Sequence, residues 1–239
     1  TIIAAQDALH AGDFERGKSL LARVRTKDPE MYIVPFYLGE AESTQAHWGE
    51  ASKQFKQAVD LNPDFEQAMT ALSRSLLFEG KPQEARIWVD KVLQMDPESF
   101  QGWYTRAAIE SAADKKLAIA AYEKAISLEN NFAPIHRDLG LLQFRQQNYA
   151  EAAKHLAAAV RLGTRNAIVY NSLGISFSRT SQLQKAVESY KNALAVEPSF
   201  AEAHVNLGSV YERLQQDAVA KKEYAAACKL DTRFCDLLH

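Results

Sequence analysis

The sequence repeats itself every 34 residues, and this period constrains the fold more than any other feature. A stretch with helix-forming residues followed by a turn recurs at 51–65, 85–100, 118–132, 183–200 and 220–234. Pro29, Pro63 and Pro97 are 34 residues apart, and Pro198 keeps this spacing if one residue is deleted between Pro97 and Pro198. A period of this length predicts an array of stacked units, because each unit alone is too small to bury its apolar face.

Each period is expected to hold two amphipathic helices. Tyr170, Leu173 and Phe177 share one face of the first helix in their repeat. The second helix of that repeat is expected to stop before Pro198, because proline cannot continue a helix. The deletion is expected in the interhelix turn at 113–116, where a loop can lose a residue without disturbing packing.

Small residues recur where paired helices must approach closely. The first inward position of the second helix carries only alanine or glycine, at Gly17, Ala51, Ala85, Ala118, Ala152, Ala186 and Ala220. A second small position lies in the first helix, at Gly39, Ser73, Ala107, Gly140, Gly174 and Gly208. Bulky residues occupy a complementary position, at Leu21, Phe55, Val89, Tyr122, Leu156, Tyr190 and Tyr224. This alternation predicts small residues packed against large ones at the usual helix separation of ~8–10 Å.

The whole chain resembles the tetratricopeptide repeat family. That family's pattern places an aromatic residue, Leu-Gly and a second aromatic in the first helix, with Ala, aromatic, Ala and Pro in the second. Residues 201–234 match it at Leu207, Gly208, Tyr211, Ala220, Tyr224 and Ala227, and depart from it with Thr232 in place of Pro. The resemblance implies an all-α fold: an α-solenoid, coiled as a right-handed superhelix, of antiparallel helix pairs in about seven units.

We expect a single repeat domain over residues 1–239. Its units are a truncated first repeat at 1–31 and complete repeats at 32–65, 66–99, 100–132, 133–166, 167–200 and 201–234. Residues 235–239 are expected to begin a capping helix or a further repeat, and excision from a longer polypeptide is favoured over dimer formation. Within residues 1–234 alone, Tyr224, Ala227 and Leu230 would lack a full partner, because each unit of an array buries its apolar face on the next.

Composition narrows the possible partners. The net charge of −2 indicates neither nucleic acid nor an anionic membrane as a partner. No apolar run is long enough for membrane insertion, and the chain is expected to be soluble. The compartment is left open: cytoplasmic, or periplasmic or extracellular if a signal has been removed. Cys228 and Cys235 are expected to be free thiols, because two cysteines seven residues apart form neither a disulfide framework nor a zinc pattern.

No catalytic motif is found, so we expect no enzymatic activity and no cofactor or metal site. His136 and His204 replace the aromatic Trp103 and Tyr170 of other repeats, and are interpreted as packing residues.

The resemblance places the binding surface on the concave side, which the first helix of each repeat lines. The groove candidates are Phe36, Arg74, Phe78, Tyr104, Arg137, Phe144, Arg145, Asn171, Arg179, Asn206 and Arg213. Arg145, Arg179 and Arg213 occupy one position in three successive repeats and predict a row of guanidinium groups. A peptide with apolar and acidic groups would suit such a groove. A cation near a helix C-terminus is also favourable without any ligand, and single aromatics on a first helix serve packing between repeats as often as they anchor a ligand.

Two patterns of the family are missing. The Lys/Asn clamp of chaperone-binding members is represented only by Asn171 and Asn206, without the paired lysines. The asparagine ladder of protein glycosyltransferase arms is also absent, since that position holds Tyr37, Ala71, Thr105, Asp138, Ser172 and Asn206.

Arg106 stands where other repeats carry a leucine, and Glu110 follows one turn later. Either the two form a buried i, i+4 pair, which we favour, or the repeat is rotated and both face solvent. In the first case Arg106→Leu is predicted to leave Glu110 unpaired.

The leading hypothesis is a protein–protein interaction scaffold that binds a peptide or protein segment. The alternative is an accessory arm of a larger multidomain enzyme or of a secretion or assembly component, with catalysis outside this chain. Self-association through uncapped terminal repeats remains open.

Overall fold

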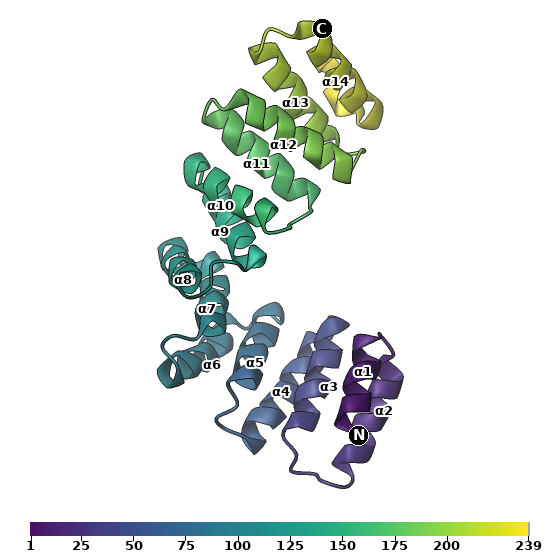
Figure 1. Ribbon diagram of the computed structural model, residues 1–239, viewed down its shortest axis with the longest axis vertical. Helices are drawn as coiled ribbons and strands as arrows, with labels where there is room; N and C mark the ends of the chain where they lie inside the picture. The colour runs from purple at the N-terminus through teal and green to yellow at the C-terminus, as the bar shows by residue number, and fades with distance from the viewer. Residues whose placement is uncertain (239) are drawn as a thin grey trace. The chain divides into compact units, whose positions relative to one another are not determined.

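The computed structural model describes residues 1–238, and every regular element in them is helical (Figure 1). The helices of the first part are α1 (Ile2–His10), α2 (Phe14–Arg25), α3 (Ile33–Thr44), α4 (Trp48–Leu61), α5 (Glu66–Phe78), α6 (Pro82–Met95), α7 (Phe100–Ala113) and α8 (Lys115–Leu128). They are followed by α9 (Ala133–Arg145), α10 (Tyr149–Arg161), α11 (Ala167–Arg179), α12 (Leu183–Val196), α13 (Ala201–Arg213), α14 (Asp217–Leu230) and the 3-10 helix η1 (Thr232–Leu238). The expected all-α fold is confirmed.

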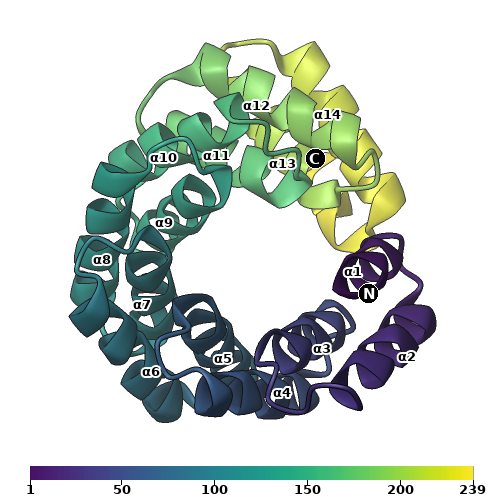
Figure 2. The same ribbon diagram turned by 60° about the horizontal axis from the view of Figure 1, so that its bottom comes forward.

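The contacts divide the chain into two compact units, Thr1–Leu128 and Glu129–His239. In each unit, successive helices pack as pairs, from α1 with α2 to α13 with α14. Within the first unit, Figure 2 shows α3, α5 and α7 on one side and their partners α4, α6 and α8 on the other. Within the second unit, α9 and α11 lie on one side and α10 and α12 on the other. The first helices of neighbouring pairs therefore share one face of each unit.

The predicted packing of small against large residues is confirmed. A methyl group added at Gly174 would lie 2.6 Å from the ring of Tyr190, and one at Gly208 would lie 2.6 Å from the ring of Tyr224. The alanines at the first inward position are all at most 1% exposed: Ala51, Ala85, Ala118, Ala152, Ala186 and Ala220. The helices of a pair thus touch where one of them lacks a side chain beyond Cβ.

A left-handed residue turns the chain between the two helices of a pair. It has φ between 58° and 79° at Gly12, Ala46, Gly80, Gln147, Ser181 and Gln215. The next amide then donates to the carbonyl five residues back, as from Gln182 to Phe177 at 2.8 Å. This bond is typical of the Schellman ending of a helix, which satisfies a carbonyl at the helix C-terminus.

The α7/α8 turn lacks that residue. Asp114 alone joins the two helices, with an extended backbone, and its Oδ1 accepts hydrogen bonds from the amides of Lys116 and Leu117. The other pairs of helices have three residues between them, as at 79–81 or 180–182. The expected turn is thus two residues shorter than the others, and α7 is one residue longer than the 13-residue helices α5, α9, α11 and α13, so the repeat loses a single residue. Side-chain capping by Asp114 takes the place of the left-handed residue.

The predicted pairing of Arg106 with Glu110 is confirmed, with 2.9 Å between Nε and Oε1. Glu110 is fully buried. Its other oxygen accepts from Arg86 on α6 at 2.7 Å, and Arg106 also pairs with Asp90. The prediction that Arg106→Leu leaves Glu110 unpaired is therefore wrong, because a second arginine holds the carboxylate.

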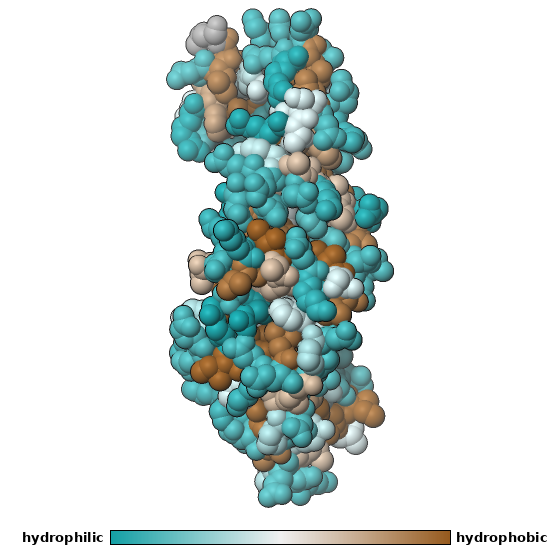
Figure 3. All heavy atoms as spheres, turned by 90° about the vertical axis from the view of Figure 1, so that its left-hand side faces the viewer, coloured by the Kyte–Doolittle hydropathy of each residue, from teal (hydrophilic) through white to brown (hydrophobic). Residues whose placement is uncertain are grey.

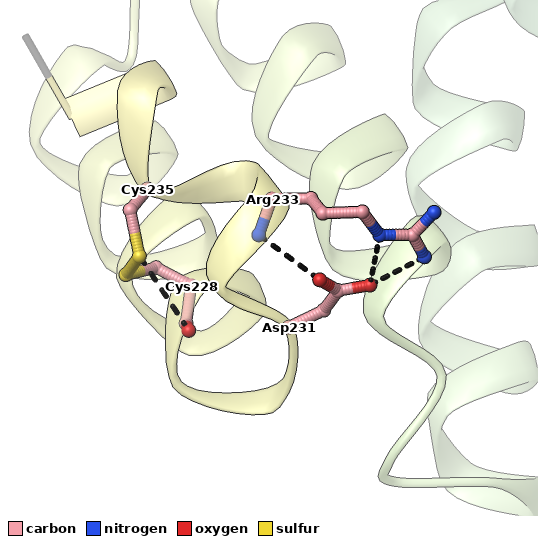
Figure 4. Close-up of a disulfide and its surroundings, with 4 residues drawn as sticks. All are labelled: Cys228, Asp231, Arg233 and Cys235. Carbon is pink, nitrogen blue, oxygen red and sulfur yellow. Dashed lines mark hydrogen bonds and ion pairs between the residues drawn. A yellow bond between two sulfur atoms is a disulfide. The ribbon is translucent and has the colours of Figure 1, made fainter.

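The expectation of free thiols is also wrong, because Cys228 and Cys235 form a disulfide (Figure 4). The bond ties η1 back onto α14, with a Cα–Cα distance of 4.5 Å. Between the cysteines, the backbone amide and guanidinium of Arg233 donate to the carboxylate of Asp231, which lowers the pKa of Asp231. The disulfide was not predicted from the sequence, because two cysteines seven residues apart match no framework of several disulfides.

The C-terminal pair is better covered than expected. Tyr224 and Ala227 are at most 5% exposed, whereas Leu230 is 46% exposed. Leu238 of η1 packs against the apolar cluster that contains Tyr224. Of the stretch 235–239, residues 235–238 belong to the 3-10 helix, and His239 lies outside the described residues. None of the helices over residues 1–238 is long and apolar enough to cross a membrane.

Candidate functional site

Three neighbouring cavities open along the first helices of the first unit, and we call them together the Glu40 cleft. The cavity between α3 and α5 has a volume of about 200 Å³, and a larger one of about 390 Å³ extends to Gln101 on α7. A third, of about 150 Å³, lies between α1 and α3. Glu40 lines all three cavities, and Arg74 lines the first two.

Glu40 is a carboxylate without a salt bridge. No lysine or arginine nitrogen lies within 4 Å of it in the described part of the chain. Partial burial by the surrounding walls raises the pKa of Glu40, and His10 on α1 partly offsets this rise. An ionised carboxylate in such surroundings gains more from an incoming cation than one surrounded by bulk water.

A stacked aromatic pair forms one wall of the cleft. The rings of Trp48 on α4 and Phe78 on α5 lie 4.4 Å apart with an angle of 23° between their planes. Phe78 is 57% exposed, and both rings line the same cavity as Glu40. An aromatic face beside a carboxylate favours a cation whose stem is apolar.

Thr70 and Arg74 stand one helical turn apart on α5 and line the larger cavity. The hydroxyl of Thr70 is buried without a hydrogen-bond partner, and the residue is 6% exposed. Arg74 is exposed, and within residues 1–238 its guanidinium has neither an ion pair nor a hydrogen bond. A buried polar group without a partner costs stability unless a ligand or water satisfies it.

The other two candidates of the first unit take part in packing. Phe36 is half-buried between Phe55 and Phe65, with ring centroids 5.7 and 4.9 Å away, although it also lines the larger cavity. Tyr104 lies beside Phe100 and Tyr122, at 6.2 Å from each ring. The structure thus brings Phe36, Arg74 and Phe78 to one cleft.

In the second unit, the arginine row lies at the C-terminal ends of α9, α11 and α13. Arg145, Arg179 and Arg213 are all exposed. Arg213 donates to the backbone oxygen and hydroxyl of Ser178, at 3.0 and 2.6 Å. The guanidinium of Arg179 lies 5.8 Å from the ring centre of Tyr149. Two of the three arginines therefore have partners within the unit.

The remaining candidates are also engaged with neighbours. Asn206 donates to the buried Asn171 at 3.0 Å, so these two residues connect α13 with α11. Arg137 pairs with Asp138 at 2.7 Å. Phe144 packs in an apolar cluster and lies edge-on to Tyr149 at 6.0 Å.

Two histidines of the second unit form a buried pair. Nδ1 of His136 on α9 lies 3.2 Å from Nδ1 of His155 on α10, and Nε2 of His136 lies 2.9 Å from the backbone oxygen of Asn130. Burial lowers the pKa of His155 to about 4. His136 is a packing residue as expected, and His204 pairs with Glu223 at 2.7 Å. Within residues 1–238, no three His, Cys, Asp or Glu side chains gather as a metal ion would require.

Sequence reasoning did not include Trp48, because it considered only the first helix of each repeat and Trp48 begins a second helix. Thr70 was missed because a threonine shows no signal until its burial is known. On the face shown in Figure 3, apolar residues appear as separate groups among hydrophilic ones. Exposed apolar side chains alone would therefore not have distinguished Phe78 from Ile87, which is also 57% exposed.

Family models described as "Tetratricopeptide repeat" match residues 38–100, 106–167 and 201–233, and one described as "TPR repeat" matches residues 179–215. The human Tetratricopeptide repeat protein 13 is 26% identical over 170 residues, which cover 69% of this chain and 20% of that protein. The human Protein O-mannosyl-transferase TMTC3 is 25% identical over 213 residues, 85% of this chain and 23% of that protein. The chain thus spans between a fifth and a quarter of these relatives' length.

A solved structure with the same fold is that of YrrB, described as a TPR protein with an unusual peptide-binding site. Its TM-score is 0.70 at 18% identity, and the match covers 76% of this chain and 94% of YrrB. At this identity the similarity concerns the fold alone.

Proposed function

Since the chain belongs to the tetratricopeptide repeat family, we propose that it is a protein–protein interaction scaffold whose first helices bind a peptide or protein segment. The observation that carries the proposal is the Glu40 cleft, where aromatic rings and the unpaired side chains of Glu40 and Arg74 line neighbouring cavities. Binding sites typically combine apolar walls with a few polar groups that converge on the ligand. The peptide-binding description of YrrB supports this reading.

In the second unit, we propose the arginine row as a separate contact for acidic groups of a partner. Arg145, Arg179 and Arg213 are exposed at equivalent positions, and guanidinium groups bind carboxylates well. In this proposal the repeat module itself is not an enzyme.

The experiment is a pull-down with the whole chain and three sets of variants. Trp48→Ala/Phe78→Ala removes the aromatic wall of the first unit, and Arg145→Glu/Arg179→Glu/Arg213→Glu reverses the row in the second. Ile87→Ala is the matched control, because Ile87 is as exposed as Phe78 but lies on α6 and lines none of the three cavities. We expect each groove variant to lose proteins that the control retains. If all variants retain the same proteins, the proposal is wrong.

A second candidate function is an arm of a larger enzyme, which the match to a protein named as a transferase favours. The complete reading frame tests it, since a catalytic domain in the same polypeptide is required. Self-association through terminal repeats is a further proposal, supported by the exposed Leu230. A light-scattering mass of 26.7 kDa at two concentrations would contradict it.

A further inference from the structure

We propose that the Glu40 cleft binds a peptide segment through a lysine or arginine side chain, which passes along the Trp48–Phe78 pair and ends at the Glu40 carboxylate. This inference rests on the proposed function and adds the chemical class of the ligand. The Glu40 cleft of the first unit would prefer basic ligands, whereas the arginine row of the second unit is proposed to contact acidic ones.

The charges of the cleft favour a cation. Across its three cavities the cleft is lined by the carboxylates of Glu40 and Glu66, the guanidinium of Arg74 and the imidazole of His10. Glu66 already accepts a hydrogen bond from Ser99 at 2.5 Å, whereas Glu40 has no cationic partner within the described residues. An acidic ligand would meet both carboxylates, so charge complementarity points to a basic one.

The aromatic pair suits the stem of a basic side chain. Lysine and arginine carry an apolar chain below the charge, and they bury this chain against apolar surfaces while the head remains polar. Trp48 and Phe78 line the same cavity of about 200 Å³ as Glu40. A cation near the indole face is also attracted by its quadrupole. The cavity therefore offers apolar contact and charge neutralisation to a single side chain.

The larger cavity next to it suits the peptide backbone. The buried hydroxyl of Thr70 has no partner, and the guanidinium of Arg74 has free N–H groups. Both are hydrogen-bond donors, and main-chain carbonyl oxygens are the acceptors that every extended peptide presents. Thr70 therefore gives a reason, independent of the acidic groups, to expect a ligand in this cleft.

The test begins with selection from a display library of random twelve-residue peptides on the whole chain. We expect enriched peptides to carry lysine or arginine next to a large apolar residue. Matched synthetic peptides with a central Phe-X-Leu, where X is Lys, Arg, Gln or Glu, are then measured by fluorescence polarisation. Their ends are acetylated and amidated so that X is the varied charge. Peptides with Lys or Arg should bind about fivefold more tightly than the Gln peptide, as one partly buried ion pair would provide.

Two substitutions at Glu40 separate charge from shape. Glu40→Gln should remove the preference for Lys or Arg, and Glu40→Arg should reverse it in favour of the Glu peptide. Because Glu40 is exposed, both variants are expected to fold, and circular dichroism checks this. Thr70→Val should weaken all four peptides alike, since its hydroxyl binds main chain.

The outcomes distinguish this inference from the proposed function. If enriched peptides need Trp48 and Phe78 but carry Asp, Glu or no charge, and bind Glu40→Arg as well as the wild type, the basic-ligand inference is wrong and groove binding stands. If no peptide is enriched, or if none is lost in Trp48→Ala/Phe78→Ala, the inference is overturned together with the first unit's role in the proposed function.

Discussion

Removing the two arginine partners of Glu110, first singly and then together, tests how a buried carboxylate is held between α6 and α7. Glu110 is 1% exposed at its side chain, whereas Arg86 and Arg106 are 34% and 24% exposed. In Arg106→Leu, Arg86 still binds Oε2. One charged hydrogen bond is lost, worth about 1.5–3 kcal/mol, and burial of a leucine returns about 1 kcal/mol. We therefore expect a net loss of about 1 kcal/mol in the free energy of unfolding.

Arg86→Met should cost a similar amount for the same reason. The double variant leaves a buried carboxylate without any cation, which costs about 3–5 kcal/mol. The loss in the double variant should therefore exceed the sum of the single losses by at least about 1 kcal/mol, as expected for residues that share one partner. Asp90 is 42% exposed, so its pairing with Arg106 should contribute little.

Urea unfolding of the whole chain, followed by circular dichroism, measures these differences. The variant Arg86→Met/Arg106→Leu/Glu110→Leu is the control, because it replaces the whole network with apolar side chains and should recover most of the stability lost in the double variant. A double variant that loses no more than the sum of the single losses would contradict the reasoning. So would a triple variant that is no more stable than the double.

Three further predictions concern other parts of the fold. Gly174→Ala should lower the free energy of unfolding by about 1 kcal/mol, because a clash with Tyr190 costs more than the ~1 kcal/mol that alanine gains in a helix. Gly49→Ala is the control: no atom lies within 4 Å of the new Cβ, so this variant should not be destabilised in the same urea assay. The pKa of His155 is lowered to about 4 from an unfolded value of about 6.5, so its contribution is full above pH 6.5 and lost as pH falls towards 4. The wild type should lose about 2 kcal/mol more than His155→Gln between pH 7 and pH 4 in urea titrations at each pH, and equal losses would exclude this role. Cys235→Ser should destabilise the end of α14 by about 2 kcal/mol at most, given the short loop that the disulfide closes, and faster hydrogen exchange confined to α14 and η1 would show it.

The repeat pattern predicted the fold because every repeat carries small and large residues at the same spacing. Gly174 against Tyr190 and Gly208 against Tyr224 follow directly from the spacing of small and large residues. The site was less predictable. Phe78 and Phe36 look alike in sequence, yet one is exposed on Trp48 and the other lies between Phe55 and Phe65.

Contacts that occur in only one repeat could not be predicted from the sequence either. Arg86 reaches Glu110 from another helix, and the disulfide depends on how the chain turns after α14. The repeat period describes equivalent positions and carries no information about a contact that occurs once. Such contacts can be identified only from the three-dimensional structure.

The α7/α8 turn shows that a repeat can lose a residue without shortening either of its helices. In this repeat the turn is two residues shorter than the others and α7 has 14 residues where α5, α9, α11 and α13 have 13, so the period falls by one residue and the left-handed residue is lost. Ala46, Gln147, Ser181 and Gln215 hold that conformation without being glycine, which costs roughly 1–2 kcal/mol at each position. The chain therefore carries several separate turns where backbone strain would be relieved by copying the Asp114 turn, with one residue in place of three and a first helix one residue longer. An engineer could shorten repeats there one by one and leave every buried face in register.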